Sequence, residues 1–543
     1  MAKKVFYDED ARQRLLAGAE ILFNAVKTTM GPKGRNVVIS KGYGSPTVTH
    51  DGVTVAKGID LPETEETMGY KTGAELIKQA ASKMNDIAGD GTTTVTVLTY
   101  HILNEANKLI AAGHNPMQLR KGLEEATREV LVGLEKLRED IAGDSKRVAE
   151  VATISAGDAA IGELIAGVIA KVGKDGVVTV EEGQGLAMES EVVEGFTFDR
   201  GFVSPYMVTD TSRMEAVYDK PLILITDKKI SSVQEFLPIL EKVAQTGKKD
   251  LVIIAEDIEG EALGTLILNR LKGVFNTIAI KAPAFGDRRK EVLQDIAVLT
   301  GGQVISEEQG FTFENADVAM LGTARRVIVD KDNTTIIEGG GSQAALKERI
   351  SQITAQGSNA SSEYEKENFD KRRAALDGKV AVIKVGGATE TEIEEKKFRV
   401  DDAVAAVKAA LDEGIVSGGG VTLVNLASSI SGDDAGKSLL KNALVQPFVQ
   451  LMENAGLNAQ ALLAQVQSAK PGQGVNVNTP EAGLADMKKS GVVDPARVTK
   501  EAILNASSIA GTAMTMGALV VDIPEKAAPA PAGGGMDPSM MGM

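Results

Sequence analysis

Apolar residues recur at helical spacing in the N-terminal part of the chain. The first such segment, residues 10–29, ends at Met30-Gly31-Pro32, where glycine and proline stop a helix. Two short runs rich in β-branched residues follow, and helical spacing then returns twice. These patterns predict strands at 36–39 and 47–49 and helices at 73–86 and 92–112.

The middle of the chain alternates short apolar runs with amphipathic segments. The runs begin at Leu222, Leu251 and Thr277, and helical spacing fills the two segments between them, 231–247 and 261–272. This β-α-β-α-β order favours a parallel sheet with right-handed crossover connections. A charged helix, a strand and a long amphipathic helix are predicted next, at 362–376, 380–383 and 390–412.

Length and composition divide the chain and narrow its chemistry. A single core stops growing at roughly 250–300 residues, so 543 residues predict several domains. The net charge, 59 − 75 = −16, disfavours nucleic acid as a partner. With no cysteine and only three histidines, thiolate chemistry and a His-rich metal site are excluded. Chemistry must therefore rest on carboxylates, hydroxyls, lysines, arginines and backbone groups.

Three segments bear on location and order. The N-terminal residues reach acids at Asp8 where a signal peptide would need an apolar run. The run 502–521 is long enough to cross a bilayer, but its polar residues, such as Asn505, favour a buried helix. We therefore expect a cytoplasmic protein with no membrane partner. Residues 527–543, rich in Ala, Pro, Gly and Met, are predicted to form a disordered tail.

The motif with the strongest chemical signal is Gly89-Asp90-Gly91-Thr92-Thr93-Thr94, at the start of a predicted helix. Glycines let backbone N–H groups approach a ligand, and a helix N-terminus attracts phosphate. Asp90 suits Mg²⁺, which takes one or two carboxylates together with phosphate oxygens. A simple Asp/Thr helix cap would use the same residue types, so the motif alone leaves both interpretations open.

Three further glycine-containing loops could line the same site. The loop 29–35 places two glycines and two cations after a helix, and the turn 51–54 holds Asp51. In Ser417-Gly418-Gly419-Gly420, three glycines let the backbone approach a bulky group. Each loop alone is also compatible with an ordinary turn.

Together, and in this order, these motifs resemble the GroEL-type (group I) chaperonins. The resemblance includes Phe285-Gly286-Asp287-Arg288-Arg289-Lys290 and extends over essentially the whole chain. It implies a multidomain α + α/β fold with a mainly helical equatorial ATPase domain, a small intermediate hinge domain and an α/β apical domain. The implied boundaries are 1–137 and 413–526 (equatorial), 138–193 and 380–412 (intermediate), 194–379 (apical) and 527–543 (tail).

The resemblance also implies an ATPase that uses ATP, Mg²⁺ and K⁺. Asp90 would bind Mg²⁺, while Asp51 and Asp402 would orient the attacking water, with Asp402 delivered by a hinge movement of the long helix. Without the resemblance, Asp402 would be interpreted as a solvated acid on a charged helix. The implied nucleotide contacts are Thr29, Met30, Gly31, Pro32, His50, Asp90, Gly91, Thr92, Thr93, Thr94, Gly419, Asn476, Val477, Asn478 and Asp494.

By the same resemblance, non-native proteins would bind apolar residues on two apical helices, and a GroES-type co-chaperonin would use the same groove. Such residues could instead simply cover the sheet, but the second helix carries more apolar positions than one buried face requires. Leu240 and Ile267 are predicted to be partly exposed. The implied contacts are Phe202, Tyr206, Met207, Leu237, Leu240, Leu263, Ile267 and Leu268.

For assembly, the resemblance implies a homo-oligomer, a heptameric ring that stacks on a second ring. In bacterial relatives an arginine–glutamate pair bridges the rings, and the matching positions here are Val449 and Asn458. Because these residues cannot form an ion pair, we predict a weakened double ring.

Three alternatives have different sequence requirements. A group II chaperonin would carry a built-in helical lid, and no apical insertion of that kind is evident. An ATP-using small-molecule transferase would need a compact acceptor pocket with a general base, which does not stand out. A non-hydrolysing scaffold would have no need of Asp51, Asp90 and Asp402 together.

Overall fold

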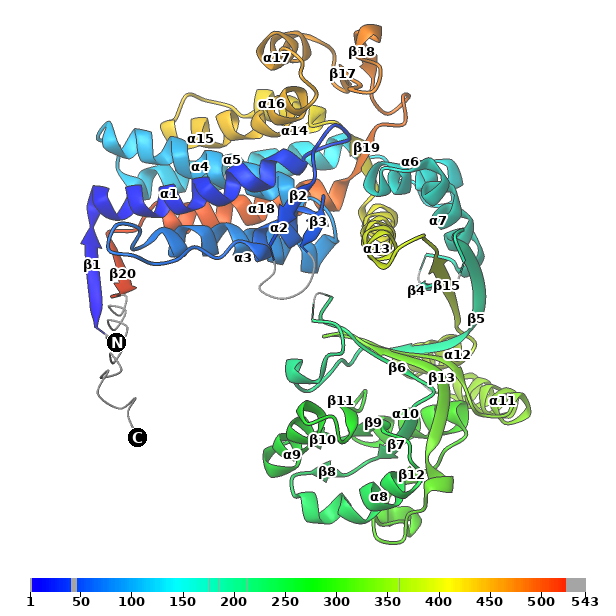
Figure 1. Cartoon of the computed structure of the whole chain (residues 1–543). Helices are drawn as coiled ribbons and strands as arrows, with labels where there is room; N and C mark the ends of the chain where they lie inside the picture. Colours follow the sequence, from blue (N-terminus) through cyan, green and yellow to red (C-terminus); the bar gives the residue numbers. More distant parts are fainter. Residues whose placement is uncertain are drawn as a thin grey trace, which may run out of the picture. The chain divides into compact units, whose positions relative to one another are not determined.

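The computed structural model describes residues 2–40, 46–174, 176–183, 185–211, 213–360 and 362–523 (Figure 1). The chain divides into two compact units, the helical unit (Met1–Gly167 with Glu390–Met543) and the α/β unit (Val168–Thr389). The mixed α and α/β architecture is thus confirmed, while the finer division into equatorial, intermediate and apical domains stays a prediction. The predicted tail, 527–543, lies outside the described residues.

Both ends of the chain contribute elements to the helical unit. Its helices and strands are β1 (Lys3–Tyr7), α1 (Asp8–Val26), η1 (Lys27–Thr29), β2 (Val37–Ile39), β3 (Thr47–Thr49), α2 (Gly52–Gly58), α3 (Tyr70–Ala88), α4 (Thr92–Ala111), α5 (Pro116–Leu137), α6 (Ser145–Ala156), α13 (Glu390–Glu413), β16 (Ile415–Ser417), α14 (Val421–Ser429), α15 (Ala435–Leu444), α16 (Gln446–Asn454), α17 (Ala459–Ser468), β17 (Gln473–Val475), η5 (Pro480–Ala482), β18 (Leu484–Asp486), β19 (Val493–Pro495), α18 (Ala496–Ala513) and β20 (Ala518–Asp522). Helix α7 (Ala159–Val172) crosses the boundary at Gly167.

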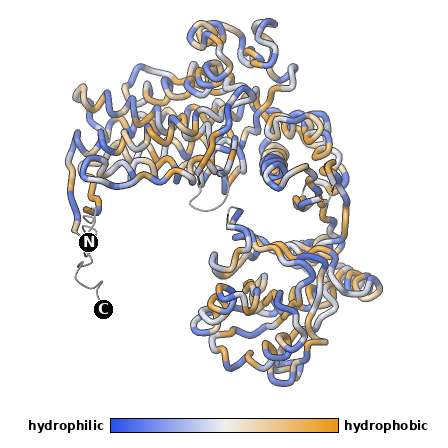
Figure 2. Tube along the Cα trace, viewed as in Figure 1, coloured by the Kyte–Doolittle hydropathy of each residue, from blue (hydrophilic) through white to orange (hydrophobic). Residues whose placement is uncertain are grey.

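Five long helices form the centre of the helical unit. Helix α18 packs against α3, α4 and α5, and α1 packs against α3 and α4 (Figure 1). Apolar and polar residues alternate along these helices (Figure 2), and the apolar sides meet in a core that includes Leu98, Leu123 and Ile503. Helices α1 and α3 approach closely because a methyl group at Gly18 would lie 1.8 Å from the carbonyl oxygen of Tyr70.

The elements predicted in the N-terminal part are confirmed. The two short strands are β2 and β3, which pair antiparallel with Val38 opposite Val48. The apolar run 502–521 is divided between α18 and β20, and β20 pairs antiparallel with β1, so that Lys3 lies opposite Asp522. Among the described residues, no helix is long and apolar enough to span a membrane.

The α/β unit contains the middle of the chain. Its elements are β4 (Val177–Glu182), β5 (Glu189–Phe198), η2 (Pro205–Met207), β6 (Ala216–Asp219), β7 (Leu222–Thr226), β8 (Lys229–Ile230), α8 (Val233–Gln245), β9 (Asp250–Ala255), β10 (Asp257–Ile258), α9 (Gly260–Leu271), β11 (Asn276–Lys281), α10 (Asp287–Thr300), β12 (Val304–Ile305), η3 (Glu307–Gln309), η4 (Val318–Met320), β13 (Gly322–Val329), β14 (Thr334–Gly339), α11 (Gln343–Asn359), α12 (Glu363–Leu376) and β15 (Lys379–Val385).

A mixed ten-stranded sheet organises this unit. Its main order is β11-β9-β7-β13-β14-β5-β15-β4, with β12 beside β7 and β6 beside β13. Strands β7, β9 and β11 are parallel, with Leu222 opposite Leu251 and Ile278 opposite Val252, which confirms the predicted β-α-β-α-β segment. Every residue of β7 is buried, as in a strand that is covered on both faces.

The strand predicted at 380–383 is β15, and it lies at the opposite end of this sheet from β11. It runs parallel to β4, with Val380 opposite Val177, and antiparallel to β5, with Val380 opposite Val193. Helix α13, which follows it along the chain, belongs to the helical unit.

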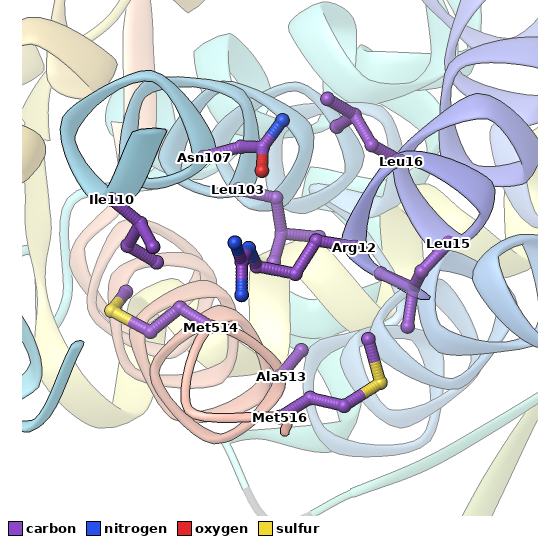
Figure 3. A pocket seen from close by; sticks show the side chains of 9 residues that line it. All are labelled: Arg12, Leu15, Leu16, Leu103, Asn107, Ile110, Ala513, Met514 and Met516. Atoms are coloured by element: carbon purple, nitrogen blue, oxygen red, sulfur yellow. The ribbon is translucent and has the colours of Figure 1, made fainter. Parts of the chain in front are cut away.

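A small pocket lies between α1, α4 and α18 in the helical unit (Figure 3). Arg12 points into the pocket, and its buried Nε atom has no hydrogen-bond partner in the described part of the chain. The α4 residues in its wall begin at Leu103, about 16 Å along the helix from Thr92, so the pocket is separate from the site described next. Its walls are formed by Arg12, Leu15, Leu16, Leu103, Asn107, Ile110, Ala513, Met514 and Met516.

Candidate functional site

The Gly89–Thr94 motif forms the turn between α3 and α4 and the first residues of α4. Gly91 is the residue before the helix and has φ +78°, a left-handed conformation that favours glycine. It supplies no side chain to cap the helix, so the first N–H groups of α4 receive no hydrogen bond from a capping side chain. The Thr92 side chain is buried, and those of Thr93 and Thr94 are half-buried. This arrangement can hold an anion.

The loop after α1 meets this turn directly. The hydroxyl groups of Thr29 and Thr93 lie 3.2 Å apart, although the residues are 64 positions apart in the sequence. Two backbone hydrogen bonds close the loop, from Gly34 N to Gly31 O at 2.9 Å and from Arg35 N to Thr28 O at 2.8 Å. Two of the predicted nucleotide loops are therefore in contact. Within the loop, Met30 is buried and Pro32 is exposed.

Asp51 caps the short helix α2 beside the same threonines. Its carboxylate accepts hydrogen bonds from Val53 N at 3.2 Å, from Thr54 N at 2.8 Å and from Thr54 Oγ1 at 2.6 Å. A methyl group at Gly52 would lie 2.4 Å from Thr93 Oγ1, so the cap of α2 touches the N-terminus of α4. Asp51 is thus fixed in orientation next to the Gly89–Thr94 turn.

Asp90 and Asp494 bring two further carboxyl groups to this place. Burial raises the pKa of Asp90, and the nearby carboxylate of Asp51 raises it further, against hydrogen bonds from Gly91 N and Ser155. Burial also raises the pKa of Asp494 to about 7, with Asp90 as the second cause. Carboxyl groups that raise each other's pKa are a favourable place for a cation.

Strand pairing places Asp494 beside the third glycine loop. In the antiparallel pair β16–β19, Asp494 lies opposite Val416, just before Gly418. A methyl group at Gly418 would lie 3.0 Å from Asp494 Oδ1. Within the described residues, no group of three or more Asp, Glu, His or Cys side chains could hold a metal ion by itself. The site therefore fits an ion such as Mg²⁺, which takes few carboxylates and also binds phosphate oxygens.

Helix α13 carries Asp402 to the same region. A methyl group at Gly89 would lie 2.3 Å from the Cβ atom of Ala405, so α13 touches the turn that holds Asp90. Asp402 is half-buried and lies three residues before Ala405, on the same side of the helix. The structure therefore places Asp402 close to the Gly89–Thr94 turn.

His50 lies between the first loop and α13. Burial is the main cause that lowers its pKa, and a hydrogen bond to the backbone of Gly31 opposes that shift. Glu395 and Arg399 of α13 also act on this imidazole, and they pair with each other at 2.8 Å. His50 is thus placed beside the loop that it is predicted to serve.

The predicted adenine contacts, Asn476, Val477 and Asn478, form a turn after β17. Asn476 Oδ1 accepts a hydrogen bond from Asn478 N at 3.0 Å. Met487 connects this region to Gly419, because its Cε atom lies 3.0 Å from where a methyl group at Gly419 would be, and its side chain also touches Gly474 of β17. No printed contact joins the three residues to Asp90, so their role stays a prediction.

Some residues at this site carry no sequence signal. Ser155 of α6 bonds to Asp90, and Asn454 of α16 bonds to the backbone of Lys27 and Met30. Neither residue belongs to a glycine motif, and Asn454 is 424 positions from Met30. The sequence analysis missed both, because only the folded chain brings them to the loops.

The predicted substrate surface lies on α8, α9 and η2 of the α/β unit. Tyr206 is 71% exposed, Leu268 is 57% exposed and Leu237 is 41% exposed. Phe202, Leu263 and Ile267 are half-buried against the core of the unit. On α9 only Ala262 and Leu266 are buried, which confirms that this helix has more apolar residues than its buried face uses.

Two predicted contacts are buried in this structure. Leu240 is 7% exposed and packs in the core with Phe236, Ile239 and Val243, so the prediction of partial exposure is wrong. Met207 is fully buried and its sulfur accepts a hydrogen bond from Ala279 N at 3.4 Å. Leu271 and Val274, which were not predicted, are exposed at the end of α9 and extend the apolar surface. We call Tyr206, Leu237, Leu268, Leu271 and Val274 the apical apolar surface.

A unit with converging glycine loops, together with an α/β unit that exposes apolar side chains, defines the chaperonin class of proteins. The model of the TCP-1/cpn60 chaperonin family matches residues 22–524, and the chain belongs to this family. It is therefore a protein-folding chaperonin, and the members of its family are ATPases that bind non-native proteins and assemble into rings.

Proposed function

We propose that this chain is a group I chaperonin whose helical unit binds and hydrolyses Mg·ATP. The observation that carries the proposal is the convergence of Thr29, Thr93, Asp51, Asp90 and Asp494 from five separate segments. An uncapped helix N-terminus beside crowded carboxyl groups suits a phosphate chain together with its cation.

Nucleotide binding would use the loops in distinct ways. The phosphates would bind at Gly91 to Thr94, the loop Thr29 to Pro32 would line the pocket, and Gly419 with Asn476 to Asn478 would face the nucleoside. Asp90 would hold Mg²⁺, which neutralises phosphate charge, and K⁺ is proposed as a second ion. The raised pKa of Asp90 supports this role, because a cation would favour its ionised form.

Hydrolysis would depend on two water-positioning carboxylates. A water oxygen attacks the γ-phosphorus, the bond to the bridging oxygen breaks, and ADP and phosphate are formed. Asp51 and Asp402 would accept hydrogen bonds from this water and hold it in line, which is most of what phosphoryl transfer requires from a protein. Three hydrogen bonds already fix the Asp51 carboxylate.

The apical apolar surface would capture non-native proteins and also bind the mobile loop of a GroES-type co-chaperonin. The connections among β7, α8, β9, α9 and β11 are short, and within the described chain none contains an extra helix. This supports group I over group II, which carries its own lid. A heptameric ring, stacked on a second ring, completes the proposal.

The test combines hydrolysis with refolding. We expect the protein to hydrolyse ATP only with Mg²⁺, and to restore activity to a denatured enzyme when ATP and a GroES-type protein are both present. Refolding that proceeds equally with a non-hydrolysable ATP analogue would contradict an ATP-driven mechanism. Refolding that needs ATP but no separate lid would favour group II.

A further inference from the structure

One short helix, α16, contacts two of the loops that form the candidate nucleotide site. The amide nitrogen of Asn454 donates hydrogen bonds to the carbonyl oxygens of Lys27 and Met30, both at 3.0 Å. A carbonyl oxygen only accepts, so the Asn454 side chain must present its NH₂ group to this loop. Both donor hydrogens of the amide are thereby used.

The neighbouring turn of α16 fixes the Asn454 amide. Gln450 is four residues earlier, on the same face of the helix, and its Nε2 atom donates to Asn454 Oδ1 at 2.9 Å. Gln450 is 8% exposed, so this hydrogen bond is shielded from water. The amide is therefore held from both ends.

The bond to Met30 O orients the next peptide unit. Because a trans peptide points its C=O and N–H in opposite directions, the Gly31 N–H points away from α16. This N–H donates to no protein atom in the described part of the chain. Leu451 packs against the same residue, since a methyl group at Gly31 would lie 2.1 Å from Leu451 Cδ2. An N–H that is held in this way, without a protein partner, is suited to an anionic ligand.

Helix α16 also touches the Ser417–Gly420 loop. A methyl group at Gly420 would lie 2.9 Å from the Cα atom of Phe448, so the backbone of α16 is in contact with this loop. One helix therefore fixes the separation of two loops that are almost 400 residues apart in the sequence. A change in the grip of Asn454 would change that separation.

We propose that Asn454, oriented by Gln450, is a positioning residue that sets nucleotide affinity by holding the Lys27–Gly31 loop against α16. The inference rests on the proposed function, because it assumes that this loop binds ATP. Asn454 does not touch the reacting atoms in this scheme, so its loss affects ATP binding more than the rate at saturation.

The experiment measures ATP affinity and steady-state hydrolysis in the assembled protein for Asn454→Ala, Gln450→Ala and the double variant. We expect Asn454→Ala to weaken ATP binding about tenfold and to change kcat less than twofold. Gln450→Ala should weaken binding about threefold. The double variant should bind like Asn454→Ala alone, because the two residues act in series. Gln446→Ala, which removes an exposed hydrogen bond of the same helix, is the matched control.

The outcomes separate this inference from the proposed function. If the wild-type protein fails to bind ATP, the proposed function fails. If the wild type binds ATP and Asn454→Ala binds it equally well, only the positioning role is overturned. If Asn454→Ala does not assemble, Gln450→Ala decides, since it leaves Asn454 in place; unchanged affinity in that variant, or fully additive effects in the double variant, would also overturn the role.

Discussion

The carboxyl groups of Asp90 and Asp494 make the pH dependence of stability informative. The pKa of Asp494 is raised to about 7, from an ordinary value near 3.8. Between these pH values the folded protein keeps a proton that the unfolded chain releases. The free energy of unfolding therefore falls as pH rises through this window.

Asp494→Asn should remove this fall. Without nucleotide and Mg²⁺, we expect the variant to be more stable than the wild type by about 2–4 kcal/mol at pH 8, and by much less at pH 4.5. Urea unfolding at the two pH values measures the difference. Asp433→Asn, at an exposed position, should show no such dependence. An equal effect of Asp494→Asn at both pH values would mean that its carboxyl group titrates normally.

Asp402 and Asp90 should fail in different ways when they are truncated. Asp402→Ala should keep ATP binding but lower single-turnover hydrolysis about 100-fold or more, because a water-positioning carboxylate is lost. Asp90→Ala should weaken Mg·ATP binding itself, by roughly 10–100-fold or more, because a metal ligand is lost. Glu394→Ala, at an exposed position of the same helix α13, is the control. Hydrolysis at the wild-type rate by Asp402→Ala would refute its role.

At the scale of single elements, helix α8 separates a binding position from a core position. Leu237 is exposed and Leu240 is buried, although they are three residues apart. The spacing in the sequence identifies one side of a helix, but it does not define how far burial extends around that side. For this reason the exposure of Leu240 could not be predicted correctly from the pattern alone.

We therefore expect Leu268→Glu and Leu240→Glu to have different effects. Leu268→Glu should fold normally and lose capture of a denatured protein, because the charge must be desolvated on binding. Leu240→Glu should destabilise the α/β unit by at least about 3 kcal/mol, since it buries an unpaired carboxylate. Thermal unfolding and a light-scattering capture assay measure the two effects, with Ser351→Glu of α11 as a charge control. Normal capture by a folded Leu268→Glu protein would argue against the apical apolar surface.

The elements that the sequence predicted well have local signals. Helix α4 was expected at 92–112 and runs from Thr92 to Ala111, because glycines precede it and its apolar period is unbroken. Helix α2 was missed, because it has seven residues with glycine at both ends and depends on the cap from Asp51. Strand β15 was predicted, but not its place, which depends on pairing with Val177, 203 residues earlier.

The same distinction holds for the candidate site. The glycine loops were predicted from their motifs, and the contact of Thr29 with Thr93 confirms that two of them meet. Ser155, Gln450 and Asn454 were not predicted, because amide and hydroxyl side chains occur everywhere on protein surfaces. Their importance comes from partners that are hundreds of residues away in the sequence.

For the whole molecule, assembly depends on charge and on the surface near α16 and α17. A ring of seven chains would carry 7 × −16 = −112 charges, so close-range contacts must offset the repulsion. Val449 is buried in the core of the helical unit, and the side chain of Asn458 caps α17. Neither residue is available for an ion pair between rings.

We therefore expect the double ring to separate easily. Exposed ion pairs are worth only about 0–1 kcal/mol each, but a symmetric ring repeats every lost contact. Mass photometry at nanomolar protein should show seven-subunit particles, and more of them when ATP is added. Raising the salt concentration should shift the balance toward stacked rings, because it screens the repulsion. Fourteen-subunit particles that persist on dilution under all conditions would contradict this prediction.

The interleaving of the two chain ends in the helical unit has a consequence for synthesis. Helix α18 lies among α3, α4 and α5, yet 496 − 137 = 359 residues separate its start from the end of α5. At about 5–20 residues per second, a ribosome needs roughly 20–70 s to cover that distance. During this time the apolar sides of the early helices lack their partner, while the α/β unit between them can already fold. A newly made subunit is therefore itself an aggregation-prone chain that benefits from protection by a finished ring.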